Sequence, residues 1–427
     1  MITAGGIGLV APTDSGTVHR PQTLEDYVAA AQRYSPLIKE QHLQTAANAA
    51  ELERLRAVYL RSRLELNGDF LFVPIVETTG GRTSFKWNAQ SATDYYGYDL
   101  GESSGHFHAG ATWTQPLLGR QAYAAAKWQT QVDADIAANR IRIERHELRR
   151  AVTEQYLLCL LDNTQTAFAD SIVALLAHQS DVVKRLAVAG LATTSDLRLL
   201  DAERTAAEEQ VTTQRTNYHT HLMELRLLCG ITDTTATELA ATDIALSAAP
   251  SSGSGFTRQY RLDSLRAEAD LRTFDVQYRP QLNLYVDGGA QFSQFSNAYR
   301  HFGWSAGLTF KWTLFDGHQR RQRLRQTRLR QEALEGYRLQ ADQQRHTRLH
   351  ECATQLRAAT ERDASLKRQL DSYDTVLANY ERELQLGQRS VIDYINVLRL
   401  RIQTQRDRLL LAGNRQLLLA AYNYWNW

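Results

Sequence analysis

The sequence repeats one plan in its two halves. In the first half, the strand-like segment GHFHAGATWTQPLLGRQ leads into a helical pattern over residues 119–189 and then into GLATTSD, residues 190–196. In the second half, FGWSAGLTFKWTLFDGHQ leads into a similar pattern over residues 317–386 and then into GQRSVID, residues 387–393. Each turn glycine is followed six positions later by an aspartate, Asp196 or Asp393. Self-similarity over such a long period indicates a duplicated architecture.

Charge and cysteine usage exclude several functional classes. The 427 residues carry a formal net charge of only +2, so no global field favours binding to nucleic acid. The three cysteines, Cys159, Cys229 and Cys352, are far apart and lie in helical pattern. This arrangement matches neither a disulfide framework nor a zinc site, and we expect buried, inert thiols.

Four segments alternate between apolar and polar residues, which is the period of a β-strand with two different faces. No apolar run reaches the roughly 18 residues that a membrane-spanning helix needs, but strands of about nine to eleven residues span a bilayer when tilted. An ordinary half-buried antiparallel sheet shows the same alternation and stays an alternative. Residues 75–105 and 291–301 read as loops within each strand pair. The apolar sets are Leu64, Leu66, Phe70 and Phe72; Phe107, Ala109, Ala111 and Trp113; Leu282, Leu284 and Val286; and Trp304, Ala306, Leu308, Phe310 and Trp312.

The helical segments are unusually long. A first helix is predicted at 24–59 with Thr23 as its N-cap. The segments 119–189 and 317–386 contain no proline, and each would extend about 100 Å at about 1.5 Å per residue. Their apolar residues follow a near-heptad spacing, and shorter return helices at 195–228 and 391–424 complete two antiparallel hairpins.

The repeat also divides the chain. We expect an N-terminal segment at 1–22, a first repeat at 23–230, an equatorial insert and linker at 231–255, and a second repeat at 256–427. The first repeat holds strands at 62–74 and 106–115 with a hairpin tip near 190–196. The second holds strands at 281–290 and 302–314 with a tip near 387–393.

Four strands leave two open edges, and an unpaired strand edge is costly in lipid. One chain cannot close a hollow barrel, so further copies related by cyclic symmetry are expected to supply the remaining strands. Spacing alone does not choose between three copies and four.

Several of these segments, taken in order, resemble the TolC-like outer-membrane efflux channels, also called outer membrane factors. The similarity covers nearly the whole chain, beginning with the helix-forming segment TLEDYVAAAQRYSPLIKEQHLQ. Its most specific parts are YRPQLNLYVDGG, the junction GLTFKWTLFDGHQRRQ with its partner GATWTQPLLGRQ, and the paired tips GLATTSDL and GQRSVIDYINVL.

The resemblance implies a mainly α fold with a β-barrel part. Duplicated helical hairpins would form an α-helical periplasmic tunnel, and the four strands of each chain would contribute to a trimeric twelve-strand barrel in the bacterial outer membrane. It also implies a passive channel of a tripartite efflux or type I secretion system. The implied partners are two further copies, a periplasmic adaptor (membrane fusion) protein and an inner-membrane pump of RND or ABC type.

The resemblance assigns a gate at the tunnel end. Asp393 and Asn396 lie three apart on one helical face, at a position where relatives carry rings of acidic residues. Asn396 replaces the second acid, so the ring is expected to be less negative here. Arg389 and Asp196 match tip positions that bridge neighbouring hairpins in relatives. Solvated tip charges are the alternative interpretation.

Relatives dock their adaptor at the same tips, which assigns Gly190, Leu191, Gly387 and Gln388 to docking. Ordinary turn chemistry also accounts for the two glycines, because glycine suits the positive φ of a helix C-cap.

The remaining motifs carry little chemistry. His346 and His350 lie four apart, but no third ligand is evident, so a polar helix surface is favoured over a metal site. The basic run RRQRLRQTRLR, residues 320–330, is interpreted as a solvated helix face near the barrel mouth. No catalytic motif or cofactor fingerprint is present, and we expect neither enzyme activity nor a cofactor.

Two other classes stay open from the sequence. A soluble trimeric coiled-coil scaffold or tether would use the strands only as a cap for its helices, and it would be extracted without detergent. A hydrolase with a helical insertion would need a clustered acid, base or nucleophile, and the sequence offers none.

Overall fold

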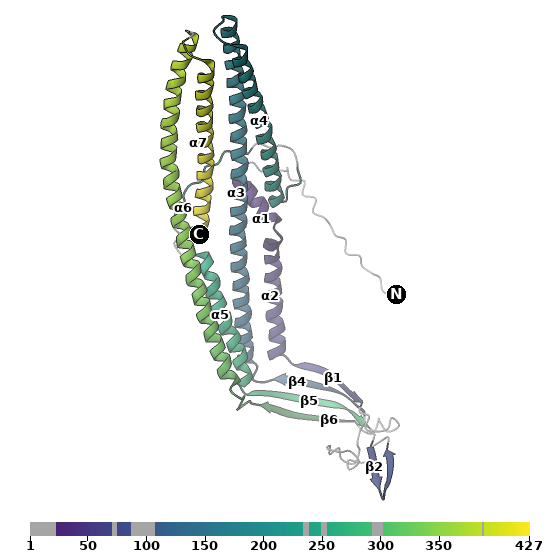
Figure 1. The fold of residues 1–427 in the computed structure, drawn as a ribbon. Helices are drawn as coiled ribbons and strands as arrows, with labels where there is room; N and C mark the ends of the chain where they lie inside the picture. The colour runs from purple at the N-terminus through teal and green to yellow at the C-terminus, as the bar shows by residue number, and fades with distance from the viewer. Residues whose placement is uncertain are drawn as a thin grey trace, which may run out of the picture. The chain divides into compact units, whose positions relative to one another are not determined.

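The computed structural model describes residues 23–70, 75–86, 107–233, 239–248, 254–292, 302–386 and 388–427 (Figure 1). The predicted N-terminal segment at 1–22 lies outside them. The chain forms two compact units. Unit 1 comprises Met1–Lys39, Ile141–Ser254 and Gln343–Trp427, and unit 2 comprises Glu40–Arg140 and Gly255–Asp342. Each unit therefore draws segments from both sequence repeats.

Unit 2 contains a four-stranded antiparallel sheet of order β1-β4-β5-β6. Its strands are β1 (Arg63–Phe70), β4 (Phe107–Pro116), β5 (Gln281–Phe292) and β6 (Phe302–Lys311). The register aligns Leu66 with Ala111, Ala111 with Gly288, and Gly288 with Trp304. Because side chains alternate along a strand, this register places the apolar residues whose side chains the structure describes on one face of the sheet, as their alternation predicts. The predicted Phe72 lies outside the described residues.

The opposite face of the sheet is polar and carries hydrogen bonds between strands. The Asn67 side-chain amide donates to Thr112 Oγ1 at 2.9 Å, and this hydroxyl donates to Asp287 Oδ2 at 2.5 Å. The three residues belong to three successive strands, so the polar face is held by a chain of contacts across the sheet.

Strands β1 and β6 are the sheet edges, and among the described strands neither has a partner on its outer side. The apolar side chains next to these edges are open to solvent. Trp304 is 78% exposed, Leu308 62% and Phe310 62% on β6, and Leu66 is 88% exposed on β1. One chain by itself thus leaves both an apolar face and two backbone edges uncovered.

A second, two-stranded sheet corrects one prediction. Residues 75–105 read as a loop in the sequence, but β2 (Ile75–Thr79) and β3 (Arg82–Lys86) pair as a hairpin. Gly80 and Gly81 connect them with φ of +62° and +78°. Two glycines with positive φ form the tight turn that matches strand twist, so the Gly-Gly pair was the signal that the loop interpretation overlooked.

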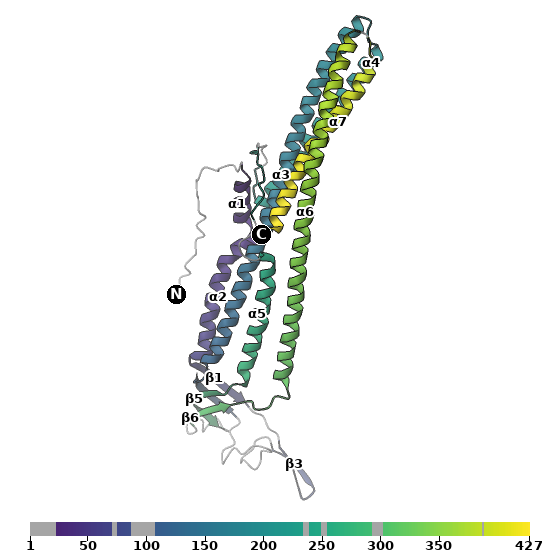
Figure 2. The same ribbon diagram turned by 90° about the vertical axis from the view of Figure 1, so that its left-hand side faces the viewer.

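Four helices of unit 2 meet the sheet, as Figures 1 and 2 show. Helix α2 (Pro36–Leu60) leads into β1, and α5 (Gly255–Asp275), continued by the 3₁₀ turn Val276–Tyr278, leads into β5. Helices α3 (Arg120–Val188) and α6 (Gln319–Gln385) follow β4 and β6 and continue into unit 1. The junction between α2 and α3 is tight, because a Cβ added to Gly119 would lie 1.8 Å from the Tyr59 carbonyl oxygen.

Asp316 fixes the start of α6. Its carboxylate accepts hydrogen bonds from the backbone N–H groups of His318 at 2.9 Å and Arg320 at 2.8 Å. These bonds lower the pKa of Asp316, and the bond from Arg320 has the largest effect. The Arg320 side chain in turn bonds Asp275 at 3.0 Å and ties α6 to α5.

The first helix is shorter than predicted. The sequence pattern indicated one helix over 24–59, but α1 (Leu24–Tyr34) ends at Ser35, and α2 begins at Pro36. Ser35 has an extended ψ of 121°. The physical reason is Pro36, which disfavours helical geometry in the residue before it and is tolerated at the first position of a helix.

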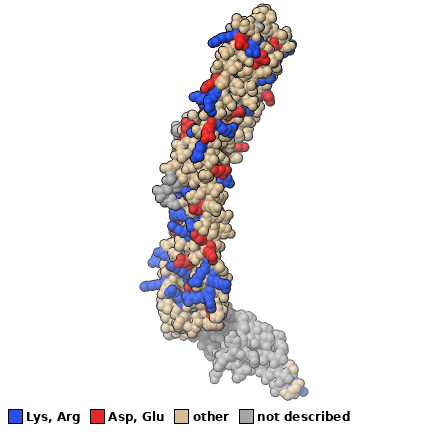
Figure 3. Space-filling model, turned by 60° about the vertical axis from the view of Figure 1, so that its left-hand side comes forward, with Lys and Arg blue, Asp and Glu red and all other residues tan. Residues whose placement is uncertain are grey.

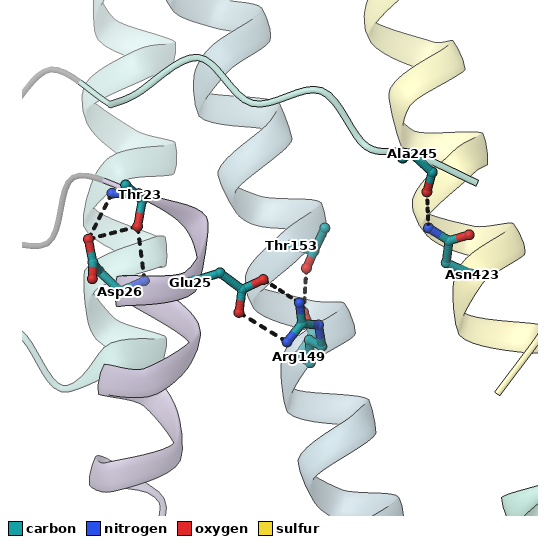
Figure 4. Close-up of polar contacts among 7 residues, drawn as sticks. All are labelled: Thr23, Glu25, Asp26, Arg149, Thr153, Ala245 and Asn423. Atoms are coloured by element: carbon teal, nitrogen blue, oxygen red, sulfur yellow. Dashed lines mark hydrogen bonds and ion pairs between the residues drawn. The ribbon is translucent and has the colours of Figure 1, made fainter. Parts of the chain in front are cut away.

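The core of unit 1 packs α1 against two other helices. Tyr27 and Ala31 of α1 contact a buried cluster that includes Val152 and Tyr156 of α3 and Leu225 of α4 (Thr194–Cys229). Thr23 and Asp26 form a capping box at the start of α1, and Glu25 pairs with Arg149 of α3 (Figure 4). Helix α1 is therefore fixed both by its cap and by its buried face.

All three cysteines are free and buried, as predicted. Burial raises the pKa of both Cys159 and Cys229 to about 12, which keeps these thiols protonated and poorly reactive.

An extended segment, residues 239–248, runs along α7 (Val391–Trp425). Ile244 N donates to Gln416 Oε1 at 2.8 Å, and Asn423 Nδ2 donates to the Ala245 carbonyl at 2.7 Å (Figure 4). Side chains of α7 thus satisfy backbone groups that have no strand partner. Among the described helices, none is long and apolar enough to cross a membrane.

Candidate functional site at the hairpin tips

The first hairpin tip connects α3 to α4. Gly190 has φ of +78°, and Leu191 N donates to the Leu186 carbonyl at 2.9 Å, a bond that closes the end of α3. Thr193 then caps α4: its backbone N–H and its hydroxyl both donate to Asp196 Oδ2 at 2.8 Å. The turn sequence GLATTSD therefore encodes a helix stop followed directly by a helix start.

The second tip, between α6 and α7, uses the same chemistry. Gln388 N donates to the Glu383 carbonyl at 2.9 Å, in the same relative positions as Leu191 and Leu186. Ser390 is the N-cap of α7, and its hydroxyl accepts from Ile392 N at 3.2 Å. Gly387, assigned to docking from the sequence, lies outside the described residues.

A shared apolar cluster, the tip core, joins the two hairpins within unit 1. It buries residues from all four helices: Ile172, Leu176, Val183, Leu200, Leu384, Val391, Tyr394, Ile395 and Leu398. Several residues of the predicted near-heptad pattern, among them Phe168, Leu186 and Tyr380, pack around it. The near-heptad spacing thus marks the faces through which the hairpins touch.

Polar contacts add specificity to this packing. The buried Gln179 of α3 bonds the Tyr394 hydroxyl of α7, and burial raises the pKa of Tyr394 to about 12. Arg399 of α7 pairs with Glu203 of α4. These contacts fix how the two hairpin tips are placed against one another.

The four residues assigned to a gate fall into two groups. Asp196 is buried, and its carboxylate is held in the cap of its own helix. Arg389 lies at the other tip, where its side chain bonds Glu383 at 3.0 Å and approaches Asp393 to 4.0 Å. Asp393 and Asn396 are both exposed on α7. Within the described part of the chain, no hydrogen bond or ion pair joins Arg389 to Asp196.

Sequence reasoning missed two contacts of Arg389. Glu383 lies six positions before it, and its carboxylate bond raises the pKa of the guanidinium. The guanidinium carbon also lies 4.4 Å from the centre of the Tyr380 ring. The signal was present in the sequence as an acidic and an aromatic residue in the last turns of the helix before the tip, but their side chains meet Arg389 only because the chain reverses there.

Exposed apolar side chains surround the residues assigned to docking. Leu191 is 46% exposed, and three residues that the sequence interpretation omitted are also open to solvent: Val188 at 92%, Leu386 at 70% and Ile392 at 48%. Isolated exposed apolar residues are common. Four of them lie at the ends of the two hairpins.

A groove of about 340 Å³ lies below the tips, between α3, α4 and α7. Its floor is apolar and includes Phe168, Ile172 and Leu176, and its rim carries Glu203 and Arg399. No cluster of three or more metal-ligating side chains occurs in the part of the chain that the structure covers. The tips and the groove thus offer apolar packing and charged surfaces.

Residues 258–421, which run from α5 into α7, match the family model described as outer membrane efflux protein. This match lies within the second repeat of the chain. A comparison with curated proteins gives no match.

Solved structures match both repeats of the chain. A membrane protein from Pseudomonas aeruginosa has a TM-score of 0.72 at 14% identity, over 94% of this chain and 90% of that one. The outer membrane protein VceC from Vibrio cholerae has a TM-score of 0.70 at 13% identity, over 94% and 95%. The open-state outer membrane channel MtrE from Neisseria gonorrhoeae has a TM-score of 0.65 at 14% identity, over 94% and 88%.

These likenesses confirm the fold class predicted from the sequence, a mainly helical chain with duplicated hairpins and a β part, and its resemblance to TolC-like channels.

Proposed function

We propose that this chain is one subunit of an outer-membrane channel that conducts solutes passively in a tripartite efflux or type I secretion system. The channel would be a homotrimer that extends from the bacterial outer membrane into the periplasm. A periplasmic adaptor and an energised inner-membrane pump would supply direction and energy. Two findings support this proposal: the match of residues 258–421 to the outer membrane efflux protein family, and the fold shared with a solved outer membrane channel. The partners, the copy number and the passive mode of transport are proposed in addition.

The observation that carries the proposal is the open sheet with its exposed apolar face. Phe302, Trp304, Leu308 and Phe310 of β6 are all more than half exposed in the single chain. Leaving such a surface in water is unfavourable, whereas lipid covers it without penalty. The polar face, with Asn67, Thr112 and Asp287, suits a water-filled interior.

Closure of the sheet requires more than one copy. Backbone groups at the edges of β1 and β6 need partners in lipid, because an unsatisfied group there costs several kcal/mol. Pairing β6 of one copy with β1 of the next would satisfy both edges with a single repeated contact. Three copies of four strands give twelve, enough to leave a passage.

The tips supply the proposed gate and docking surface. The gate is assigned to Asp196, Arg389, Asp393 and Asn396. Arg389 is held by Glu383 and Asp393 within its own tip. Opening of the gate would therefore have to break or redirect these ion pairs. Adaptor docking is assigned to the tip residues Gly190, Leu191, Gly387 and Gln388. The exposed apolar side chains of these tips, Val188, Leu191, Leu386 and Ile392, support docking there.

The test combines extraction, particle mass and conductance. The full chain is expected to need detergent for extraction, to purify as a particle of three copies, and to produce discrete conductance steps in planar lipid bilayers. A monodisperse particle extracted without detergent, with no conductance, would favour the soluble coiled-coil scaffold. A detergent-dependent particle of another copy number would overturn the trimer alone.

A further inference from the structure

The first turns of α6 carry an arginine stripe, formed by Arg321, Arg325 and Arg328. Their spacing of four and three residues places them on one side of the helix. All three are exposed. The stripe belongs to the basic run 320–330, which the channel function leaves without a role.

The arginines on the neighbouring side of the same turns are engaged by other residues. Arg320 bonds Asp275 of α5, and Arg323 lies 5.9 Å from the Phe274 ring centre. Thr327, on this side, is buried. The stripe faces away from these contacts, and within the described residues none of its three guanidinium groups has a hydrogen bond or ion pair. Their charges are therefore available to a ligand.

The stripe lines a hollow of the surface. The hollow has a volume of about 580 Å³ and is lined by Arg321, Gln322, Leu324, Arg325 and Arg328. No acidic residue takes part in the lining. Lys and Arg side chains gather in the lower part of the space-filling view in Figure 3. A concave surface with several guanidinium groups and no carboxylate suits a phosphate group, which accepts paired N–H donors.

The position of the stripe indicates the source of the phosphate. Strand β6 ends at Lys311 and α6 begins at Gln319, so the stripe follows the sheet closely. Between them, Trp312 is 51% exposed and donates its Nε1–H to the Tyr278 carbonyl at 3.2 Å. Aromatic residues such as Trp and Tyr concentrate where a membrane meets water, and basic residues beyond them attract anionic headgroups.

The other strand–helix junctions of unit 2 carry cations too. Arg61 lies between α2 and β1, Arg63 begins β1, Arg120 begins α3, and Arg279 precedes β5. A second copy is a poor occupant of the stripe, because the carboxylates next to the end of α2, which would adjoin α6 in a closed barrel, are already paired. Glu51 pairs with Arg54, Glu53 with Arg61 and Glu65 with Arg63.

We infer that Arg321, Arg325 and Arg328 bind the phosphate groups of anionic phospholipids in the leaflet next to the helices. The inference rests on the proposed membrane channel and adds a lipid ligand to it. The lipid phosphates would bridge the arginines of the hollow and fix the depth of the barrel in the bilayer.

The experiment uses the full chain in detergent and measures its affinity for phosphatidylglycerol and for phosphatidylcholine in mixed micelles. The test variant is R321Q/R325Q/R328Q. The control is R357Q/R362Q/R368Q, which removes the same charge from exposed positions of the same helix. At about 1 kcal/mol per arginine, the test variant is expected to lose on the order of a hundredfold in affinity for phosphatidylglycerol. The control is expected to keep the wild-type affinity.

Equal affinity of wild type for the two lipids, or equal loss in both variants, would overturn the inference. Binding of inorganic phosphate is measured as a second test. If phosphate binds the wild type but not the test variant, and the wild type binds both lipids equally, the stripe binds a soluble anion and the lipid assignment is wrong. Conductance of all variants in phosphatidylcholine bilayers separates the two claims. A wild type that fails to conduct there refutes the channel, whereas a test variant that conducts but keeps its lipid preference refutes only the lipid site.

Discussion

Gly190 shows at the scale of one residue how the first tip depends on backbone conformation. Its φ of +78° closes α3, and a Cβ at this position would meet no atom within 4 Å. Any cost of adding a side chain there is therefore conformational, because left-handed geometry is unfavourable for L-residues. Gly336 in α6 provides the comparison. It also has open space around it, but it lacks a positive φ, so a side chain there causes no backbone strain.

We predict that Gly190→Ala lowers the free energy of unfolding by about 1 kcal/mol. Gly336→Ala should raise it by about 0.5–1 kcal/mol, because alanine loses less backbone entropy in a helix than glycine. Thermal unfolding of the two variants side by side measures the contrast. If the two substitutions change the free energy of unfolding in the same direction, the positive φ of Gly190 does not determine the stability of the first tip.

Arg389 belongs to the proposed gate, and its contacts give that proposal a direct test. Arg389→Ala removes the bond to Glu383 and the approach to Asp393, which should loosen the second tip and increase single-channel conductance in lipid bilayers. Arg348→Ala is the matched control, because Arg348 forms a comparable pair with Glu351 within α6. Unchanged conductance of the Arg389 variant would count against the gate.

At the scale of elements, the end of α7 is held against α3 by a stack around His146. The His146 ring lies between Tyr424 and Trp427, with ring centres 4.8 Å and 4.1 Å away, and its Nε2 lies 2.9 Å from the Tyr424 carbonyl. Arg142 and Arg150 approach the outer rings. Burial lowers the pKa of His146, an effect that the Tyr424 carbonyl partly opposes.

This lowered pKa predicts a pH dependence of stability. The His146 ring binds a proton more readily in the unfolded chain than in the folded one. The contribution of the neutral ring to folding stability is therefore present above the ordinary histidine pKa of about 6.5, and it is lost as the pH falls below this value. His146→Gln should therefore be less stable than wild type at neutral pH, and the difference should shrink toward pH of about 5. Unfolding midpoints measured across this range test the effect.

The exposed His219 of α4 provides the control. His219→Gln should keep the pH profile of wild type. A constant difference between wild type and His146→Gln at every pH would show that the stack contributes packing alone.

At the scale of the whole molecule, insertion into lipid depends on which face of the sheet is apolar. Leu308 and Thr309 are neighbours on β6, and the strand alternation places them on opposite faces. An arginine on the lipid face of a barrel costs about 2–4 kcal/mol near the bilayer midplane, whereas residues facing the lumen tolerate charge.

Leu308→Arg should therefore reduce the fraction of the chain that inserts into lipid vesicles, and Thr309→Arg should insert like wild type. The protease-protected fraction after reconstitution measures insertion. Equal insertion of the two variants would contradict the assignment of faces and, with it, the proposed barrel.

Local signals in the sequence specify the elements and their repetition. Alternation identified β1, β4, β5 and β6, and the absence of proline identified α3 and α6, because backbone geometry imposes these periods locally. The caps that follow both turns, Thr193 with Asp196 and Ser390 with Ile392, are likewise local hydrogen bonds. Pro36 and the Gly80–Gly81 pair were equally local signals, and the break before α2 and the β2–β3 hairpin could have been predicted from them.

The tertiary structure alone decided which residues from distant segments meet. Strand register, the tip core, the partners of Arg389 and the grouping of both repeats into each compact unit depend on contacts between segments far apart in the chain. Such contacts form because apolar faces bury one another and buried polar groups require partners. Many arrangements satisfy the same periodicity, so the pattern of one segment does not specify which side chain another segment will place beside it.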